Sequence, residues 1–232
     1  LVITSDKSYE NIEQKHAYTE SDRLGGRDPY SASKGCAELV TRAYTTSYFS
    51  TQRQHLVGVA TARAGNIIGG GDWAEDRLIP DAMRAFASGE ILNIRSPTST
   101  RPWQHVLDPL AGYLLLCERM WDDPEKFSGG WNFGPENHGI VTVETVANLL
   151  AQCYEGNARW EPTNSENELY EANLLNLDIS KAKTQLGWTP KWPLEKAVAK
   201  TVDWYRHLQE GENMVPFTFD QIDEFEETMT IC

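Results

Sequence analysis

An α/β fold is predicted, because segments typical of strands alternate with segments typical of helices along all of the 232 residues. Residues 1–4 and 56–62 are nearly all apolar, as parallel strands buried on both faces are. Helix-start signals recur at Pro29, at Asp108 followed by Pro109, and at Thr142. The length suits one large domain or two small ones.

The first part of the chain contains a strand, a loop and a helix. Residues 1–4 predict a strand, and the polar residues 5–28 predict a loop, which at this length is usually functional. A helix is expected over 29–49. Its apolar positions repeat at helical spacing, so we expect them to form a buried face: Cys36, Leu39, Val40, Ala43, Tyr44 and Tyr48.

The rest of the chain continues the alternation. Strands are expected at 56–62, 91–94, 131–133 and 174–177. Helices are expected at 80–88, 108–121, 142–154, 180–186 and 193–209, with Gly89 and Gly187 past two of their ends. Residues 65–72 are a glycine-rich turn without the spacing of a dinucleotide fingerprint. The segment after Gly211 is acidic, and we expect it to be mobile.

Charge and cysteine content exclude several classes of protein. The net charge of −13 argues against a nucleic-acid partner, although a local arginine cluster can still bind a small anion. The four cysteines form no CxxC pair, so neither a metal site nor a disulfide framework is predicted, and a cytoplasmic location fits best. No apolar run approaches the ~18 residues of a membrane span.

Tyr30 and Lys34 form a YxxxK pair on the predicted helix. The i, i+4 spacing puts both side chains on one face, where the ammonium favours the phenolate form of the tyrosine. Such a pair can supply a base to a sugar hydroxyl. By itself, a surface lysine beside a core tyrosine is the commoner outcome of this spacing.

The triplet Ser5-Asp6-Lys7 directly follows the first strand. Loops at the carboxyl ends of parallel strands are where α/β sheets place ligand chemistry. Three adjacent groups of different acidity could divide three proton-transfer tasks. Alone, such a run is more often a turn.

Read together, the two motifs resemble an extended short-chain dehydrogenase/reductase, and within it the NAD-dependent sugar-nucleotide 4,6-dehydratases. Five further segments resemble the subgroup that acts on CDP-glucose: TSDKSYEN, GGRDPYSASKG, ARAGNIIGGGDWAEDRLIPD, RPWQHVLDPLAGYL and WNFGP. Residues 177–190 match the usual tail of extended members. The resemblance covers roughly residues 1–210.

The resemblance implies dehydration of CDP-glucose to its 4-keto-6-deoxy form, with hydride passing to tightly bound NAD and back, for deoxysugar and surface polysaccharide (O-antigen) biosynthesis. Tyr30 would take the proton of the 4-hydroxyl, with Ser5 bonded to the same oxygen and Lys34 on the nicotinamide ribose. Lys7 would be the base at C5, and Asp6 the acid for the departing 6-hydroxyl.

Arg63 would lie near the nicotinamide. Six residues are candidate substrate contacts, with Arg101 the best match to a phosphate ligand: Asn66, Arg77, Arg95, Arg101, His105 and Asn132. The same resemblance assigns 1–70 to the end of a Rossmann-like NAD-binding domain, 71–210 mainly to a smaller α/β nucleotide-sugar domain, and 211–232 to an acidic tail.

Alternatives remain open. A dTDP-sugar enzyme would carry glutamate at Lys7, and a UDP-sugar inverting enzyme usually replaces Tyr30 with methionine. A nucleotide-sugar epimerase is possible, as is an inactive truncated binding module. Relatives carry GxxGxxG ahead of Leu1, so we expect this chain alone to bind NAD poorly and to be inactive. The full-length protein is expected to be a homodimer or larger homo-oligomer.

Overall fold

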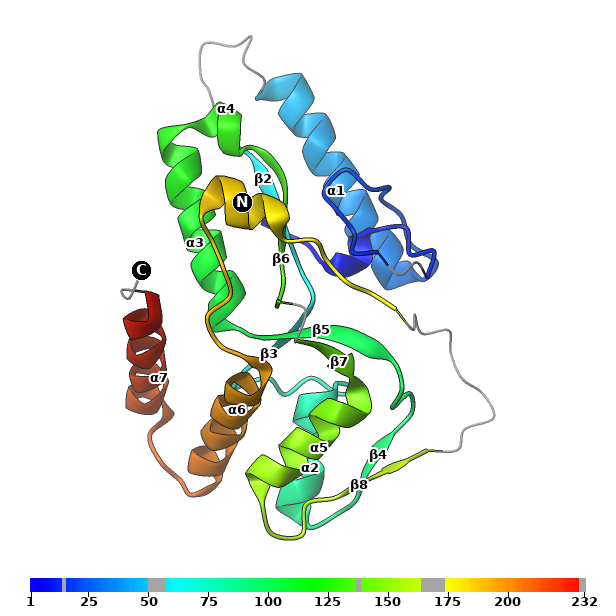
Figure 1. Cartoon of the computed structure of the whole chain (residues 1–232), viewed down its shortest axis with the longest axis vertical. Helices are drawn as coiled ribbons and strands as arrows, with labels where there is room; N and C mark the ends of the chain where they lie inside the picture. The colour runs from blue at the N-terminus through cyan, green and yellow to red at the C-terminus, as the bar shows by residue number, and fades with distance from the viewer. Residues whose placement is uncertain (14–15, 50–56, 137–138, 164–173, 230–232) are drawn as a thin grey trace. The chain divides into compact units, whose positions relative to one another are not determined.

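The computed structural model describes residues 1–13, 16–49, 57–136, 139–163 and 174–229 (Figure 1). They form two compact units with interleaved sequences. Unit 1 comprises Leu1–Asn66, Asp108–Gly134 and Leu174–Pro190, and unit 2 comprises Ile67–Leu107, Pro135–Asn173 and Lys191–Cys232. The expected boundary near residue 70 is close to the first division. Two later segments, Asp108–Gly134 and Leu174–Pro190, return to unit 1, whereas the sequence assigns 71–210 mainly to one domain.

Unit 1 contains a three-stranded parallel sheet in the order β1-β2-β6. Its elements are β1 (Val2–Ile3), the 3-10 helix η1 (Asp6–Ser8), α1 (Pro29–Tyr48), β2 (Ala60–Ala64), most of α3 (Leu107–Asp122), α4 (Pro124–Phe127), β6 (Gly129–Phe133) and a short π-helix (Ala182–Leu186). Helices α1 and α3 lie on opposite sides of the sheet (Figure 1).

The two faces of this sheet differ in chemistry because side chains alternate along each strand. Three alanines of β2 join Trp131 and Phe133 of β6 in an apolar core with α3. Thr61 and Arg63 point to the opposite side, where both bond to Glu38 of α1. Strand β2 is therefore buried by apolar packing on one face and by a polar network on the other.

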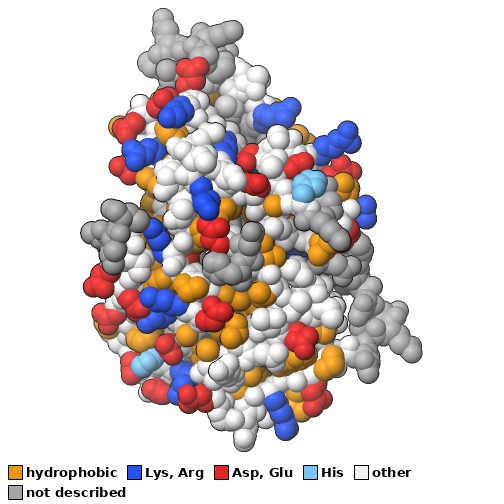
Figure 2. Space-filling model, in the orientation of Figure 1, with side chains coloured by type: hydrophobic (Ala, Val, Ile, Leu, Met, Phe, Trp, Pro, Cys, Tyr) orange, Lys and Arg blue, Asp and Glu red, His pale blue; other side chains and the backbone are white. Residues whose placement is uncertain are grey.

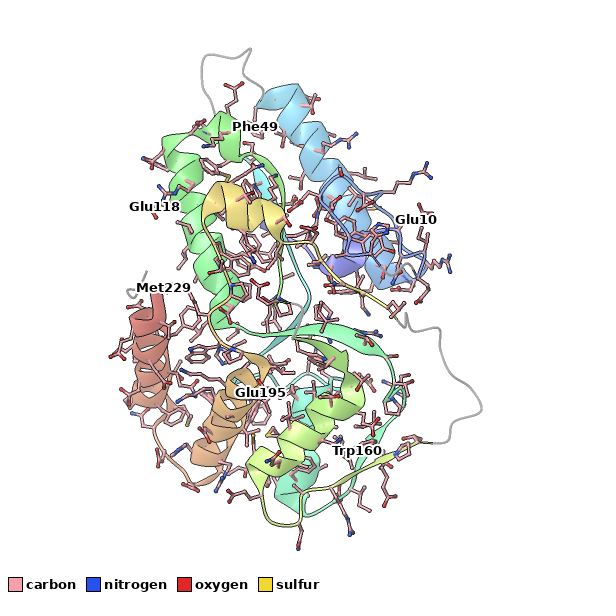
Figure 3. All side chains as sticks on the ribbon, viewed as in Figure 1. Glu10, Phe49, Glu118, Trp160, Glu195 and Met229 are labelled. Carbon is pink, nitrogen blue, oxygen red and sulfur yellow. The ribbon has the colours of Figure 1, made fainter. Side chains whose placement is uncertain are left out.

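Unit 2 combines two small sheets with four helices. One sheet has the order β3-β5-β7, from β3 (Asn66–Ile68), β5 (Thr100–His105) and β7 (Ile140–Thr142), and the other pairs β4 (Leu92–Ile94) with β8 (Trp160–Pro162). Its helices are α2 (Leu78–Ser88), α5 (Val143–Tyr154), α6 (Leu194–Gln209) and α7 (Met214–Met229). Trp160, labelled in Figure 3, donates to Asn148 of α5 at 2.8 Å and so joins β8 to that helix.

The apolar stripe of α1 is not buried as expected. Leu39, Val40, Tyr44 and Tyr48 are all more than half exposed, whereas the buried positions of the helix are Ser31, Gly35 and Glu38. The prediction is wrong because small and polar groups, not the apolar stripe, make the contacts with the rest of unit 1. A β-carbon on Gly26 would lie 2.4 Å from the Ala32 nitrogen, so the preceding loop crosses α1 closely.

The acidic segment after Gly211 forms helix α7, so the expectation of a mobile tail is wrong for residues 214–229. Phe225 is buried against Trp192, with ring centroids 5.2 Å apart. Glu224 pairs with both Lys196 and Lys200 of α6. Apolar burial and paired charges together hold an acidic sequence as a helix.

Helices 29–48, 143–154 and 194–209 confirm their predictions closely, and Thr142 caps the second of these as expected. Strands β5, β7 and β8 were not predicted, and β3 lies inside the expected turn at 65–72. The expected strand at 174–177 is reduced to an isolated bridge between Leu177 and Tyr18.

The described helices include none with both the length and the apolar content needed to cross a bilayer. Acidic, basic and apolar side chains are interspersed over the face seen in Figure 2.

Candidate active site

The corner Ser5-Asp6-Lys7 is shaped by its own hydrogen bonds. Ser5 caps helix η1, and its Oγ accepts from the Lys7 nitrogen at 3.2 Å while donating to Asp6 Oδ1 at 2.9 Å. Asp6 is 3% exposed and Lys7 is half-buried. The corner thus holds a hydroxyl and a buried carboxyl side by side at the carboxyl end of β1.

Helix α1 brings the YxxxK pair to this corner. Asp28 caps the helix by accepting from the Ser31 nitrogen at 3.0 Å, and Pro29 occupies its first turn. The Lys7 Nζ lies 5.9 Å and the Lys34 Nζ 5.7 Å from the centre of the Tyr30 ring. Two cations from different elements therefore converge on one phenol. Glu10, in the loop that follows η1, is labelled in Figure 3.

Tyr30 is open to a ligand, with 52% of its surface exposed. The capping carboxylate of Asp28 has its pKa held below the usual value by hydrogen bonds from Ser31, with the charge of Lys7 adding to the effect. Hydroxyl, carboxyl and cationic groups thus all lie around Tyr30, where they could bind a polar or anionic ligand.

Beneath the corner lies a buried ion pair between Glu38 of α1 and Arg63 of β2. The guanidinium donates through Nε at 2.9 Å and Nη2 at 2.7 Å to the two carboxylate oxygens. Glu38 also accepts from the hydroxyls of Thr4 and Thr61. Burial by itself would raise the pKa of Glu38, but the bonds from Arg63 and the threonines hold it below its ordinary value.

Arg63 extends this hydrogen-bond network to Tyr9, which directly follows η1. Its Nη1 donates to the Tyr9 hydroxyl at 2.6 Å, and Tyr9 donates to Asn132 Oδ1 at 2.7 Å. The Asn132 amide in turn donates to the carbonyls of Tyr18 and Asp178. Burial raises the pKa of Tyr9 to about 12, against the charge of Arg63.

Two predicted ligand contacts therefore have internal partners. The cofactor role assigned to Arg63 and the substrate role assigned to Asn132 stay predictions. The structure, however, engages the polar atoms of both side chains inside unit 1. Asn66 is half-buried at the start of β3.

The remaining predicted substrate residues lie in unit 2. Arg77 and Arg95 are largely exposed and pair with Asp72 and Asp76 at 3.1 and 3.4 Å. Arg101 is 3% exposed and donates to the Thr100 carbonyl at 2.9 Å.

His105 of unit 2 is also buried. Its Nδ1 accepts from the Leu107 nitrogen at 3.3 Å, and its ring packs 4.7 Å from that of Trp192. Burial, with the charge of Lys200, lowers the pKa of His105 to about 4. A neutral imidazole in the protein interior follows.

Glu38 and Tyr9 were not singled out from the sequence. Two patterns could have found Glu38. Glu38 follows Lys34 by one more helical turn, and Thr61 and Arg63 alternate with alanines in a strand that is buried throughout. A buried strand carrying an arginine demands a buried acid.

One further group of possible metal ligands occurs in the described residues: His207, Glu210 and Glu212, with ligand atoms within 4.8 Å of one another. Glu212 already pairs with the imidazole of His207 at 3.0 Å. The cluster is partly exposed, and such acidic groups are common at surfaces.

Comparison with known proteins places this geometry in a family context. A family model described as GDP-mannose 4,6 dehydratase matches residues 1–201. Over 225 residues the chain is 46% identical to a CDP-glucose 4,6-dehydratase of Salmonella typhimurium, a match that covers 96% of this chain and 62% of the relative.

Solved structures share the fold. A dTDP-glucose 4,6-dehydratase of Bacillus anthracis, in complex with NAD, superposes with a TM-score of 0.72 at 22% identity, over 90% of this chain and 61% of that one. A UDP-glucose 4-epimerase of Thermotoga maritima gives a TM-score of 0.70 at 21% identity, over 89% and 63%. The α/β fold related to the Rossmann domain is thereby confirmed.

The chain spans about 62% of the length of the Salmonella relative. The family model nevertheless matches nearly all of the described helices and strands, including the corner, the YxxxK helix and the buried pair beneath them. The chain therefore belongs to the GDP-mannose 4,6 dehydratase family.

Proposed function

We propose that the full-length protein carrying this chain dehydrates CDP-glucose to CDP-4-dehydro-6-deoxy-glucose with NAD as a bound cofactor. The observation that carries the proposal is the convergence of Lys7 and Lys34 on the exposed Tyr30, beside the Ser5–Asp6 pair. The 46% identity to a CDP-glucose 4,6-dehydratase supports the choice of nucleotide. NAD, when bound, accepts a hydride and returns it, and Tyr30 and Lys34 would contact its nicotinamide ribose.

The chain's own residues would move the protons. Tyr30 takes the proton of the sugar 4-hydroxyl, and Ser5 bonds to that oxygen. Lys7 removes the C5 proton once the 4-ketone has acidified it, and Asp6 protonates the departing 6-hydroxyl. Each general acid or base of this kind contributes typically about 10²–10⁴-fold.

The candidate substrate residues are proposed to bind the nucleotide end. A guanidinium suits a diphosphate because its planar fork can donate two parallel bonds to phosphate oxygens. Arg101 is the first choice. Asn66, Arg77, Arg95, His105 and Asn132 are secondary choices, and Arg63 is a secondary choice for the cofactor.

An epimerase is the second candidate, because the fold is shared with a UDP-glucose 4-epimerase. Loss of water separates the two reactions. We would incubate the full-length protein with NAD and CDP-glucose and follow the product by mass spectrometry. A product lighter by one water supports the dehydratase, whereas an isomer of unchanged mass would support the epimerase. dTDP-glucose and UDP-glucose in parallel reactions test the choice of nucleotide.

The role of Lys7 is tested by Lys7→Ala. Oxidation at C4 should continue, seen as reduced cofactor at its absorbance band, while loss of water should fall by about 10²–10⁴-fold because the C5 base is gone. Lys126→Ala, at a lysine on α4, is the control. Dehydration at the normal rate in Lys7→Ala would refute the assignment.

We also propose a homodimer or larger homo-oligomer formed through α1. Support comes from its exposed stripe of Leu39, Val40, Tyr44 and Tyr48, since a contiguous apolar surface of this kind is typical of interfaces. Sedimentation of Val40→Glu against the unchanged protein tests it.

A cytoplasmic location and a place in deoxysugar synthesis for surface polysaccharide, such as O-antigen, are proposed on the resemblance to sugar-nucleotide 4,6-dehydratases. The free thiols of Cys36, Cys117 and Cys153 are compatible with that location.

A further inference from the structure

We propose that the buried Glu38–Arg63 pair is a positioning device that sets helix α1, and with it Tyr30, in register with the Ser5–Lys7 corner. The inference rests on the proposed function, since the groups it aligns are the proposed acid–base residues. Neither Glu38 nor Arg63 needs to touch the substrate for this role.

The corner is fixed at both of its ends by this one ion pair. Thr4, immediately before Ser5, donates its hydroxyl to Glu38 Oε1. Tyr9, immediately after η1, accepts from Arg63 Nη1 at 2.6 Å. The chain between these two anchors is the corner itself, so its position depends on where the ion pair lies.

The helix is fixed by the same carboxylate. Glu38 follows Tyr30 and Lys34 at i+8 and i+4, so all three project from one side of α1. Its two oxygens receive four donors, one from Thr4 just after β1 and three from β2: the Thr4 and Thr61 hydroxyls and the Arg63 Nε and Nη2. With Glu38 3% and Arg63 4% exposed, solvent offers no competing partner. A slide of α1 along the sheet would break all four bonds at once.

A merely stabilising role makes a different prediction. An ion pair that served only stability would affect folding and not chemistry. Buried ion pairs also contribute little net stability relative to apolar packing. The two threonines distinguish the positioning role from a purely stabilising role. Both donate one hydroxyl bond to Glu38, but Thr4 adjoins the corner whereas Thr61 lies within β2.

The experiment therefore compares Thr4→Val with Thr61→Val in the full-length protein. Misplacement of catalytic groups by about 1 Å can cost about 10²-fold, so Thr4→Val should lower kcat for CDP-glucose dehydration by about 10-fold or more with KM nearly unchanged. Thr61→Val should change kcat by less than about 2-fold, because the corner keeps its direct anchor. Thr4→Ser, which keeps the hydroxyl, should restore kcat.

A second measurement needs no turnover. In the unchanged protein, the Lys7 side chain and the Tyr30 ring should give a nuclear Overhauser contact, which Glu38→Gln and Thr4→Val should weaken and Thr61→Val should keep. Glu224→Gln, at an ion pair of unit 2, is the matched control for charge removal.

The outcomes separate the two proposals. Equal kcat losses in both valine variants, or a persistent Lys7–Tyr30 contact in Glu38→Gln, would overturn the positioning role. A protein that shows the Lys7–Tyr30 contact and its loss in Thr4→Val, yet releases no water from CDP-glucose, would sink the proposed function and leave the positioning role standing.

Discussion

Tyr30 is the side chain on which the proposed chemistry depends most directly. It is half exposed, while two lysines from separate elements approach its ring within 6 Å. Tyr30→Phe keeps the ring and its packing but removes the hydroxyl that exchanges a proton. We expect kcat to fall by about 10²–10⁴-fold, the usual contribution of a general base.

Steady-state kinetics with CDP-glucose, together with a thermal melt, check this prediction. Tyr44→Phe is the matched control, since Tyr44 lies on the same helix with similar exposure and its ring lies 5.5 Å from that of Tyr48. A Tyr30→Phe enzyme with normal kcat would remove Tyr30 from the reaction.

The site could be predicted from the sequence only where its groups are close along the chain. Tyr30 and Lys34 share a helix face by spacing, and Ser5–Lys7 is a contiguous triplet. Glu38 escaped because acids on helices are normally solvated, and only the fold shows that Thr4 and Arg63 come to meet it. Partners far apart in sequence leave no local signal.

Helix caps made several elements predictable, and tertiary contacts made others unpredictable. Thr142 and Gly187 bound helical segments as expected because capping depends on neighbouring residues alone. Strand β5 includes Arg101 and Pro102, which do not favour a strand, and it forms by pairing with β7. Helix α7 buries only Gln221 and Phe225, too few apolar positions for a helical periodicity to show.

The contribution of Phe225 to the stability of unit 2 can be measured. This ring is 3% exposed and packs edge-on against Trp192. Phe225→Ala should lower the free energy of unfolding of unit 2 by about 3–5 kcal/mol, because a large side chain leaves a cavity in a packed core.

Urea denaturation followed by tryptophan fluorescence gives the change. The control is Phe219→Ala on the same helix, where the ring is 59% exposed and its loss should cost little. Equal stability of the two variants would mean that α7 does not dock on unit 2 through Phe225.

The start of α1 affects both folding and the site. Asp28 accepts from the Ser31 nitrogen and hydroxyl, and it is the cap of the helix that carries Tyr30. Asp28→Ala should cost about 0.5–2 kcal/mol of stability, and Asp28→Asn, which can still cap, should cost less. Differential scanning calorimetry of the two variants tests this order, and the reverse order would deny Asp28 its capping role.

The free energy of unfolding of the protein should fall in acid in two separate steps, and His105 should cause the first. The pKa of folded His105, about 4, lies below the ordinary value of 6.5, so the unfolded chain binds its proton first as the pH falls. Stability that is fully present above pH ~6.5 is therefore lost progressively down to pH ~4, by about 3 kcal/mol for a shift of this size. The second step comes from Glu38 and Glu224, whose folded pKa values are lowered, so their contribution is lost only as the pH falls below the ordinary carboxylate range.

Urea midpoints at pH 7 and pH 5 isolate the first step. His105→Gln should flatten the change between these two values. An unaltered pH dependence in His105→Gln would show that the buried imidazole does not govern the first loss of stability.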